Sequence, residues 1–122
     1  MELFEKEKNK MLSKKEDTFS FEGFIDRGIR FIESFSLLNA ELWKRFAEQF
    51  VIHSDCEGNT RTWKGEYWGK MMRGACFIYS YTKNEELYAV LAKTNEDLMN
   101  TADENGRIST YTADKEFEGW DI

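Results

Sequence analysis

The sequence contains no proline, although at the average usage of about 5% a chain of this length would carry roughly six. Proline breaks the interior of a helix because it lacks a backbone N–H and its ring clashes with the preceding turn. Its absence therefore favours long, uninterrupted helices and argues against a loop-rich β sandwich. The first expectation is an all-α fold.

Cysteine and histidine are also scarce. The two cysteines, Cys56 and Cys76, lie in no CxxC spacing, and His53 is the only histidine. Two cysteines are too few for a disulfide scaffold, so we expect a reduced, cytoplasmic setting. A structural zinc site takes about four Cys or His ligands, and we expect no metal or other cofactor within this chain. Cys76 lies in an apolar segment and is predicted to be a small buried residue.

Long apolar runs and an excess of positive charge are missing as well. No stretch approaches the ~18 consecutive apolar residues of a membrane span, and the N-terminal residues lack the apolar region of a secretory signal. The net charge is −6, from 17 basic and 23 acidic residues, which disfavours contact with phosphate backbones. We therefore expect neither a membrane nor a nucleic acid as a partner. The sequence also has no nucleophile elbow, phosphate loop or dinucleotide fingerprint.

Aromatic residues, in contrast, are plentiful: 10 Phe, 5 Tyr and 4 Trp. Such rings fill a core or line a groove, and composition does not distinguish the two. Residues 1–18 alternate Glu and Lys with little apolar content, which predicts a charged N-terminal arm that is frayed or loose. Residues 19–122 are predicted to form one domain.

The first half of this domain has two segments with helical spacing. From Phe21 to Phe35, apolar residues recur in steps of three and four and so share one helical face, with Ser20 as the expected N-cap. Asn39 is the expected cap of a second helix, which should end near His53. A loop is predicted over residues 54–60.

The second half predicts two more helices. Residues 63–81 are apolar over so much of the helix circumference that we expect burial on several sides. A polar link over residues 82–86 leads to a helix with an apolar face, ended by the Asn105-Gly106 turn signal. Residues 107–112 alternate loosely, as in a short extended piece. The four helices are predicted to pack as antiparallel hairpins, because their links are short.

Three glycines interrupt the segment 63–81, namely Gly65, Gly69 and Gly74. Each costs a helix about 1 kcal/mol relative to alanine when it is interior. Their presence predicts close backbone packing, or an irregular start to this helix.

Three short motifs in order carry a resemblance to a known family: GEYWGK from Gly65 to Lys70, NGRISTY from Asn105 to Tyr111, and the C-terminal EFEGWDI. Over about residues 20–122 the chain resembles the bacterial β-L-arabinofuranosidases of glycoside hydrolase family 127 and their uncharacterised relatives. The resemblance implies that the hairpins form part of an (α/α)6 toroid. It also implies a carbohydrate substrate of the arabinofuranoside type.

The catalytic part of that family lies downstream of the region covered here. The resemblance implies a cysteine nucleophile and zinc, bound by further cysteines and a glutamate, for the full-length family. Cys56 and Cys76 match none of those positions. The chain is therefore expected to be the N-terminal part of a glycoside hydrolase, inactive without its downstream part.

Six residues are candidates for binding substrate: Glu66, Trp68, Lys70, Tyr111, Trp120 and Asp121. In one interpretation, Glu66, Trp68 and Lys70 line the mouth of the toroid. In the simpler one, Glu66 and Lys70 form only an ion pair on the helix surface, because they are four positions apart. Trp120 and Asp121 together are typical of a sugar-binding site. Alternatively, the Trp120 ring covers the end of the core at the start of the next helix. The tyrosine offers its hydroxyl to a ligand or packs with its OH at the rim.

Two functional hypotheses follow. A partial sugar enzyme leaves apolar faces exposed where further helices dock, and we expect such a chain to self-associate. A non-catalytic module, which binds a protein or a glycan, closes its apolar faces among its own helices. In the module, Trp63, Trp68 and Trp120 are either buried or gathered in one exposed patch.

Overall fold

The computed structural model describes residues 20–56 and 63–117. Within them the elements are all helical, which confirms the all-α prediction. In chain order they are α2 (Phe24–Ile32), the π-helix η1 (Glu33–Leu37), α3 (Ala40–Ile52), the 3₁₀ turn η2 (Ser54–Cys56), α4 (Lys64–Thr82) and α5 (Glu85–Met99). The predicted N-terminal arm lies outside the described residues.

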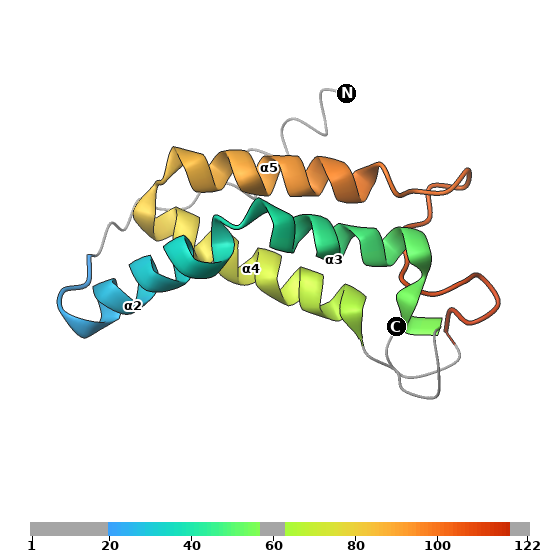
Figure 1. The fold of residues 1–122 in the computed structure, drawn as a ribbon, viewed down its shortest axis with the longest axis horizontal. Coiled ribbons are helices and arrows are strands. Elements are labelled where there is room, and N and C mark those ends of the chain that lie inside the picture. The colour runs from blue at the N-terminus through green and yellow to red at the C-terminus, as the bar shows by residue number, and fades with distance from the viewer. Residues whose placement is uncertain (1–19, 57–62, 118–122) are drawn as a thin grey trace, which may run out of the picture.

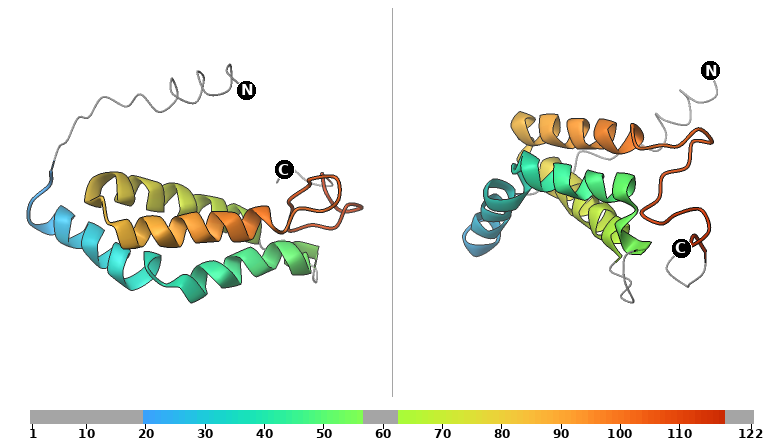
Figure 2. Two further views of the ribbon diagram at one scale, coloured as in Figure 1. Left: turned by 90° about the horizontal axis from the view of Figure 1, so that it is seen from above. Right: turned by 45° about the vertical axis from the view of Figure 1, so that its right-hand side comes forward.

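Three long helices, α3, α4 and α5, form the body of the molecule (Figure 1). α4 runs antiparallel to both of its neighbours, so the predicted antiparallel hairpins are present. α2 lies at the end of the body where α4 turns into α5, and Figure 2 shows it projecting to one side.

The caps of α3 and α5 follow from local sequence. The Asn39 side chain accepts a hydrogen bond from the Leu42 amide (3.2 Å), so the predicted cap is confirmed. α3 ends at His53, whose backbone is left-handed with φ of 50°. The Asn84 side chain caps α5 by accepting from the Glu86 amide (3.0 Å). The polar link expected over residues 82–86 is thereby shortened to two residues.

The core lies between the three body helices. Trp43, Leu87 and Ala75 are fully buried and come from α3, α5 and α4 respectively. Trp68 stands edge-on to Trp43, with ring centroids 6.5 Å apart, and edge-on to Phe50 at 6.4 Å. Burying each large apolar side chain contributes about 1.5–3 kcal/mol. The core therefore depends on rings supplied by two helices.

α4 is less buried than its composition predicted. Its buried residues are Trp68 and Ala75, whereas Tyr67 and Phe77 are exposed. The expectation of burial on several sides is wrong, because α3 and α5 both cover the same side of α4. The expectation that Cys76 is buried is wrong for the same reason, since its side chain lies on the uncovered side.

The three glycines of α4 have different surroundings. A Cβ added to Gly65 would stand 3.0 Å from the Thr110 hydroxyl and 3.5 Å from the Phe50 ring, so close packing is confirmed at this position. At Gly69 and Gly74 an added Cβ would meet nothing within 4 Å. Close packing is therefore the wrong explanation for those two.

The start of α2 differs from the prediction. Gly23, with φ of 68°, precedes the helix and no side chain caps it, so Ser20 is not the N-cap. The Tyr81 hydroxyl instead holds this entry, accepting from the Phe21 amide (3.1 Å) and donating to the Asp26 carboxylate (2.9 Å). The helix therefore begins later than its apolar spacing suggested.

The end of α2 passes into the π-helix η1. The Leu38 amide donates to the Glu33 carbonyl, five residues back, at 3.0 Å. This wider turn buries the Glu33 side chain, which accepts from the Thr82 hydroxyl at 2.6 Å, and brings Leu37 into the core. The uninterrupted α-helix predicted through Phe35 is thus wrong over its last turn.

The predicted turn at Asn105-Gly106 is present, but it does not end α5, which stops earlier at Met99. Gly106 has φ of 79°, and its amide donates to the Asp103 carbonyl (2.9 Å). Residues 107–112 form no strand in the described part of the chain, but they pass beside η2. There the Asp55 amide donates to the Thr110 carbonyl (3.2 Å).

Candidate functional site

Two of the predicted sugar-binding residues form an ordinary surface ion pair. Lys70 Nζ lies 2.7 Å from Glu66 Oε1, and both side chains are exposed. The hydrogen bond from the Lys70 ammonium to the Glu66 carboxylate raises the pKa of Lys70 above its usual value. The pair is one helical turn apart on α4, as the i, i+4 spacing predicts.

The structure does not bring Trp68 together with this pair. Its ring lies in the core, and its buried Nε1 has no hydrogen-bond partner among the described residues. Tyr111 lies half-buried in the loop after α5, where its carbonyl accepts from Arg107 Nη1 at 3.3 Å. The candidates Trp120 and Asp121 fall outside the described residues.

The start of α4 holds a buried carboxylate that the sequence did not reveal. Asp55 accepts from the Lys64 amide at 3.1 and 2.9 Å through its two oxygens, and from the Gly65 amide at 3.4 Å. It therefore caps the helix from the preceding turn and places a negative charge at the positive end of the helix dipole. Nothing in local spacing signals this cap, because Asp55 lies nine residues before Lys64.

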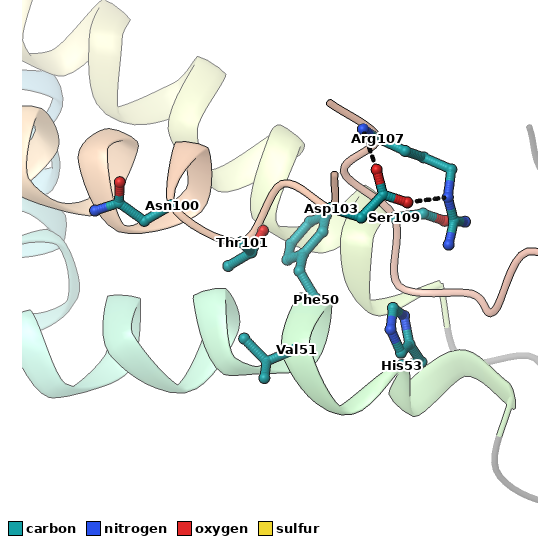
Figure 3. A pocket seen from close by; sticks show the side chains of 8 residues that line it. All are labelled: Phe50, Val51, His53, Asn100, Thr101, Asp103, Arg107 and Ser109. Atoms are coloured by element: carbon teal, nitrogen blue, oxygen red, sulfur yellow. Dashed lines mark hydrogen bonds and ion pairs between the residues drawn. The ribbon is translucent and has the colours of Figure 1, made fainter. Parts of the chain in front are cut away.

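A shallow pocket of about 240 Å³ lies between the end of α3 and the loop after α5 (Figure 3). Phe50 and Val51 contribute apolar surface, and the other lining residues are polar: His53, Asn100, Thr101, Asp103, Arg107 and Ser109. Sites for small molecules are commonly about 300–1,000 Å³, so this pocket suits at most a small polar group.

The charged groups of the pocket are used by the turn that carries them. The Asp103 carboxylate accepts from the Arg107 amide (2.9 Å), the Arg107 Nε (3.2 Å) and the Asn105 amide (2.9 Å). These bonds, above all the one from the Arg107 amide, lower the pKa of Asp103. Arg107 Nη1 also donates to Glu116 at 2.8 Å, which raises the pKa of Arg107. Both charges therefore hold the turn together.

The family resemblance places its zinc ligands downstream of the described residues. Within these ranges no group of three or more His, Cys, Asp or Glu side chains is arranged to hold a metal ion. Cys56 Sγ instead accepts from the Thr112 amide at 3.1 Å, and Cys76 contacts the sulfur of Met72 at 3.8 Å.

The apolar face of α2 and η1 is exposed. The exposed fractions are 82% for Phe24, 51% for Ile25, 62% for Phe31, 48% for Ile32 and 71% for Phe35. Phe31 and Phe35 stack with ring centroids 5.2 Å apart and planes within 10°. We call these five residues the α2 apolar face.

The opposite side of α2 holds it to the body. Asp26 accepts from the Tyr81 hydroxyl and pairs with Arg30 at 3.1 Å, while the Glu33 carboxylate accepts from Thr82 at the end of α4. The bond from Tyr81, followed by the one from Arg30, lowers the pKa of Asp26. An amphipathic helix normally turns its apolar stripe inward. α2 has no fully buried residue, and its attached side combines the polar Asp26 and Glu33 with the partly buried Ile29.

Comparison of the chain with models of protein families, with curated proteins and with solved structures finds no match. Within the described ranges, no helix combines the length and the apolar character needed to cross a bilayer.

Proposed function

We propose that this chain is a helical docking module that binds a protein partner through the α2 apolar face. The observation that carries the proposal is the orientation of α2, which binds the body through Asp26 and Glu33 and leaves the five large side chains of the α2 apolar face exposed. The module thus does not close all of its apolar faces among its own helices, contrary to the expectation from the sequence. Soluble proteins rarely expose contiguous apolar surface of more than a few hundred Å², and larger patches mark interaction sites.

Energetics favour burial of this face against a partner. Covering a Phe or Ile side chain that was exposed to water contributes about 1.5–3 kcal/mol. Three of the five residues are phenylalanines, namely Phe24, Phe31 and Phe35, and aromatic side chains supply much of the anchoring energy of protein interfaces. The core of the body forms without any of them, so the face is available for binding.

Site-specific photo-crosslinking tests the proposal. A benzoylphenylalanine at position 31, in the full chain within the cells that produce it, should give a discrete adduct. The same group at Arg73, on the exposed side of α4, should give none. Absence of an adduct at position 31, or equal labelling at both positions, would count against docking through α2.

Reconstitution with the purified, crosslinked species completes the test. Ile32→Glu, on the α2 apolar face, should weaken the complex by about 100-fold, because a carboxylate would have to be buried. Ile52→Glu is the matched control, since Ile52 is similarly exposed at 55% but lies at the far end of α3. Equal effects of the two substitutions would contradict a site on α2.

A relation to the β-L-arabinofuranosidases is a second proposal. It is supported by the GEYWGK and NGRISTY motifs, by the antiparallel hairpins of the body, and by the exposed α2 apolar face, which is the feature expected of a chain whose further helices are missing. In this proposal the remaining helices of an (α/α)6 toroid cover α2, and carbohydrate contacts the exposed Glu66–Lys70 pair. The purified chain should not hydrolyse a chromogenic arabinofuranoside. Hydrolysis by the purified chain would contradict the expectation that the catalytic part of this family lies downstream.

A further inference from the structure

We infer that the partner on the α2 apolar face is a second copy of this chain, bound as an antiparallel α2–α2 pair about a two-fold axis at Gly28. This inference rests on the proposed docking function and names its partner. Two observations point to it: the distribution of apolar residues along α2, and the surroundings of Gly28.

The four exposed apolar residues of α2 are spaced symmetrically about Gly28, which is also the midpoint of the helix Phe24–Ile32. The remaining apolar residue, Ile29, is partly buried and lies outside this exposed set. In an antiparallel pair centred there, Phe24 of each copy lies beside Ile32 of the partner subunit. Ile25 similarly lies beside the partner's Phe31. All four side chains are about half exposed or more. A two-fold interface requires such a self-complementary patch, because the same surface serves both copies.

Gly28, like Gly69 and Gly74, has no close packing in the isolated chain that explains a glycine, but it alone lies at the centre of an exposed apolar face. An added Cβ would meet nothing within 4 Å, and the backbone has ordinary helical geometry. Glycine in a helix interior lowers the helix-forming equilibrium about fivefold relative to alanine. At the crossing point of two helices, however, the missing side chain lets the backbones approach closely, since the side chains at the contact set the interaxial distance.

The size of the face suits a reversible dimer. Its five side chains expose roughly 600 Å² per copy, so two copies would bury at most about 1,200 Å², at the lower end for specific interfaces. The α2 apolar face is also accessible, because α2 projects from the side of the body and attaches through Asp26 and Glu33 on its other side (Figure 2). We expect a dissociation constant in the micromolar range.

Sedimentation velocity of the purified 122-residue chain at about 1–200 µM measures the dimer directly. Ile32→Glu should raise the dissociation constant about 100-fold, because the two-fold axis places the new carboxylate in the interface twice. Ile52→Glu should leave the constant unchanged. Monomer throughout this concentration range would overturn the inference.

Gly28→Ala separates the interface from the fold because it should change the two in opposite directions. The monomer should become more stable, since the new methyl group has room and favours helix. The dimer should weaken about tenfold, because two methyl groups would meet at the crossing. Gly69→Ala, on the exposed part of α4, should stabilise the monomer and leave the dimer unaffected. Unchanged dimerisation in Gly28→Ala would contradict the proposed axis.

Failure of the dimer inference can be distinguished from failure of the proposed docking function. If the chain is monomeric but position 31 still crosslinks to another protein, the dimer inference is wrong and the docking function stands. If the chain is monomeric and position 31 gives no adduct, both the dimer inference and the docking function are wrong.

Discussion

Single residues set the start of α4. Asp55, which is buried in η2, accepts hydrogen bonds from two first-turn amides that would otherwise lack a protein partner. A carboxylate in this position also interacts favourably with the helix dipole. The beginning of the longest helix in the body thus depends on a residue outside it.

Removal of this cap should be costly. Asp55→Ala is expected to lower the free energy of unfolding by about 1–3 kcal/mol, because the amides of Lys64 and Gly65 lose their acceptor. Urea denaturation followed by circular dichroism measures the change. Glu104→Ala, at an exposed position, should shift the value by less than about 0.5 kcal/mol. A comparably small change for Asp55→Ala would mean that α4 does not need this cap.

Two glycines of α4 should respond to alanine with opposite signs. Gly65→Ala forces a Cβ to within 3.0 Å of Thr110 and should destabilise the fold by about 1–3 kcal/mol. Gly74→Ala has open space and should stabilise it by up to about 1 kcal/mol through helix propensity. Paired urea titrations of the two variants give both numbers. Shifts of the same sign would show that the space around one of these glycines is not as described.

At the scale of elements, α2 is the helix whose sequence pattern and position differ most. Its apolar spacing is typical of a helix that packs on a core, yet Tyr81 and Thr82 of α4 bind its polar side. The π-helical turn at Glu33 makes this attachment possible, because it turns the buried carboxylate toward the end of α4. α2 is therefore attached to the fold without contributing apolar surface to the core.

Loss of an aromatic ring from α2 should hardly affect the monomer. Phe31→Ser is expected to change the free energy of unfolding by less than about 0.5 kcal/mol at low protein concentration, because the ring is exposed. Leu87→Ala, in the core, should cost about 2–5 kcal/mol. Chemical denaturation of both variants compares them. A Phe31→Ser cost close to that of Leu87→Ala would place the ring in an intramolecular core.

At the scale of the whole molecule, stability should fall in acid. The pKa values of Asp26 and Asp103 are lowered in the folded chain, so their stabilising bonds are fully present above the unfolded-state value of about 3.9. That stabilisation is lost as the pH falls through the folded-state values. Tyr81→Phe removes the largest cause of the Asp26 shift and should make the loss between about pH 5 and pH 2 shallower.

Thermal melts across this pH range measure the effect. Tyr67→Phe is the control, because Tyr67 is an exposed tyrosine on the same helix. An acid profile of Tyr81→Phe that follows the unmodified chain would show that the hydrogen bond to Asp26 has no influence on folding. The absolute melting temperature is not decisive here, because loss of the hydroxyl also removes the bond to Phe21.

The sequence alone determined the helical class, the order of the helices, the Asn39 cap and the Glu66–Lys70 pair. Each of these depends on residues within about four positions of one another, where helix geometry itself sets the distance. The apolar face of α5, which includes Leu87 and Leu91, was also predictable, because its apolar residues form a single stripe and only that side of the helix is buried.

Only the tertiary structure decided which helix faces are buried. Spacing showed that α2 is amphipathic, but its orientation follows from Tyr81, 55 residues beyond Asp26, and from Thr82, 49 residues beyond Glu33. The position of Trp68 in the core, away from the Glu66–Lys70 pair, depends likewise on the rings of α3. Whether a helix face is buried depends on the residues packed against it. Those residues are distant in the sequence, so local spacing does not identify them.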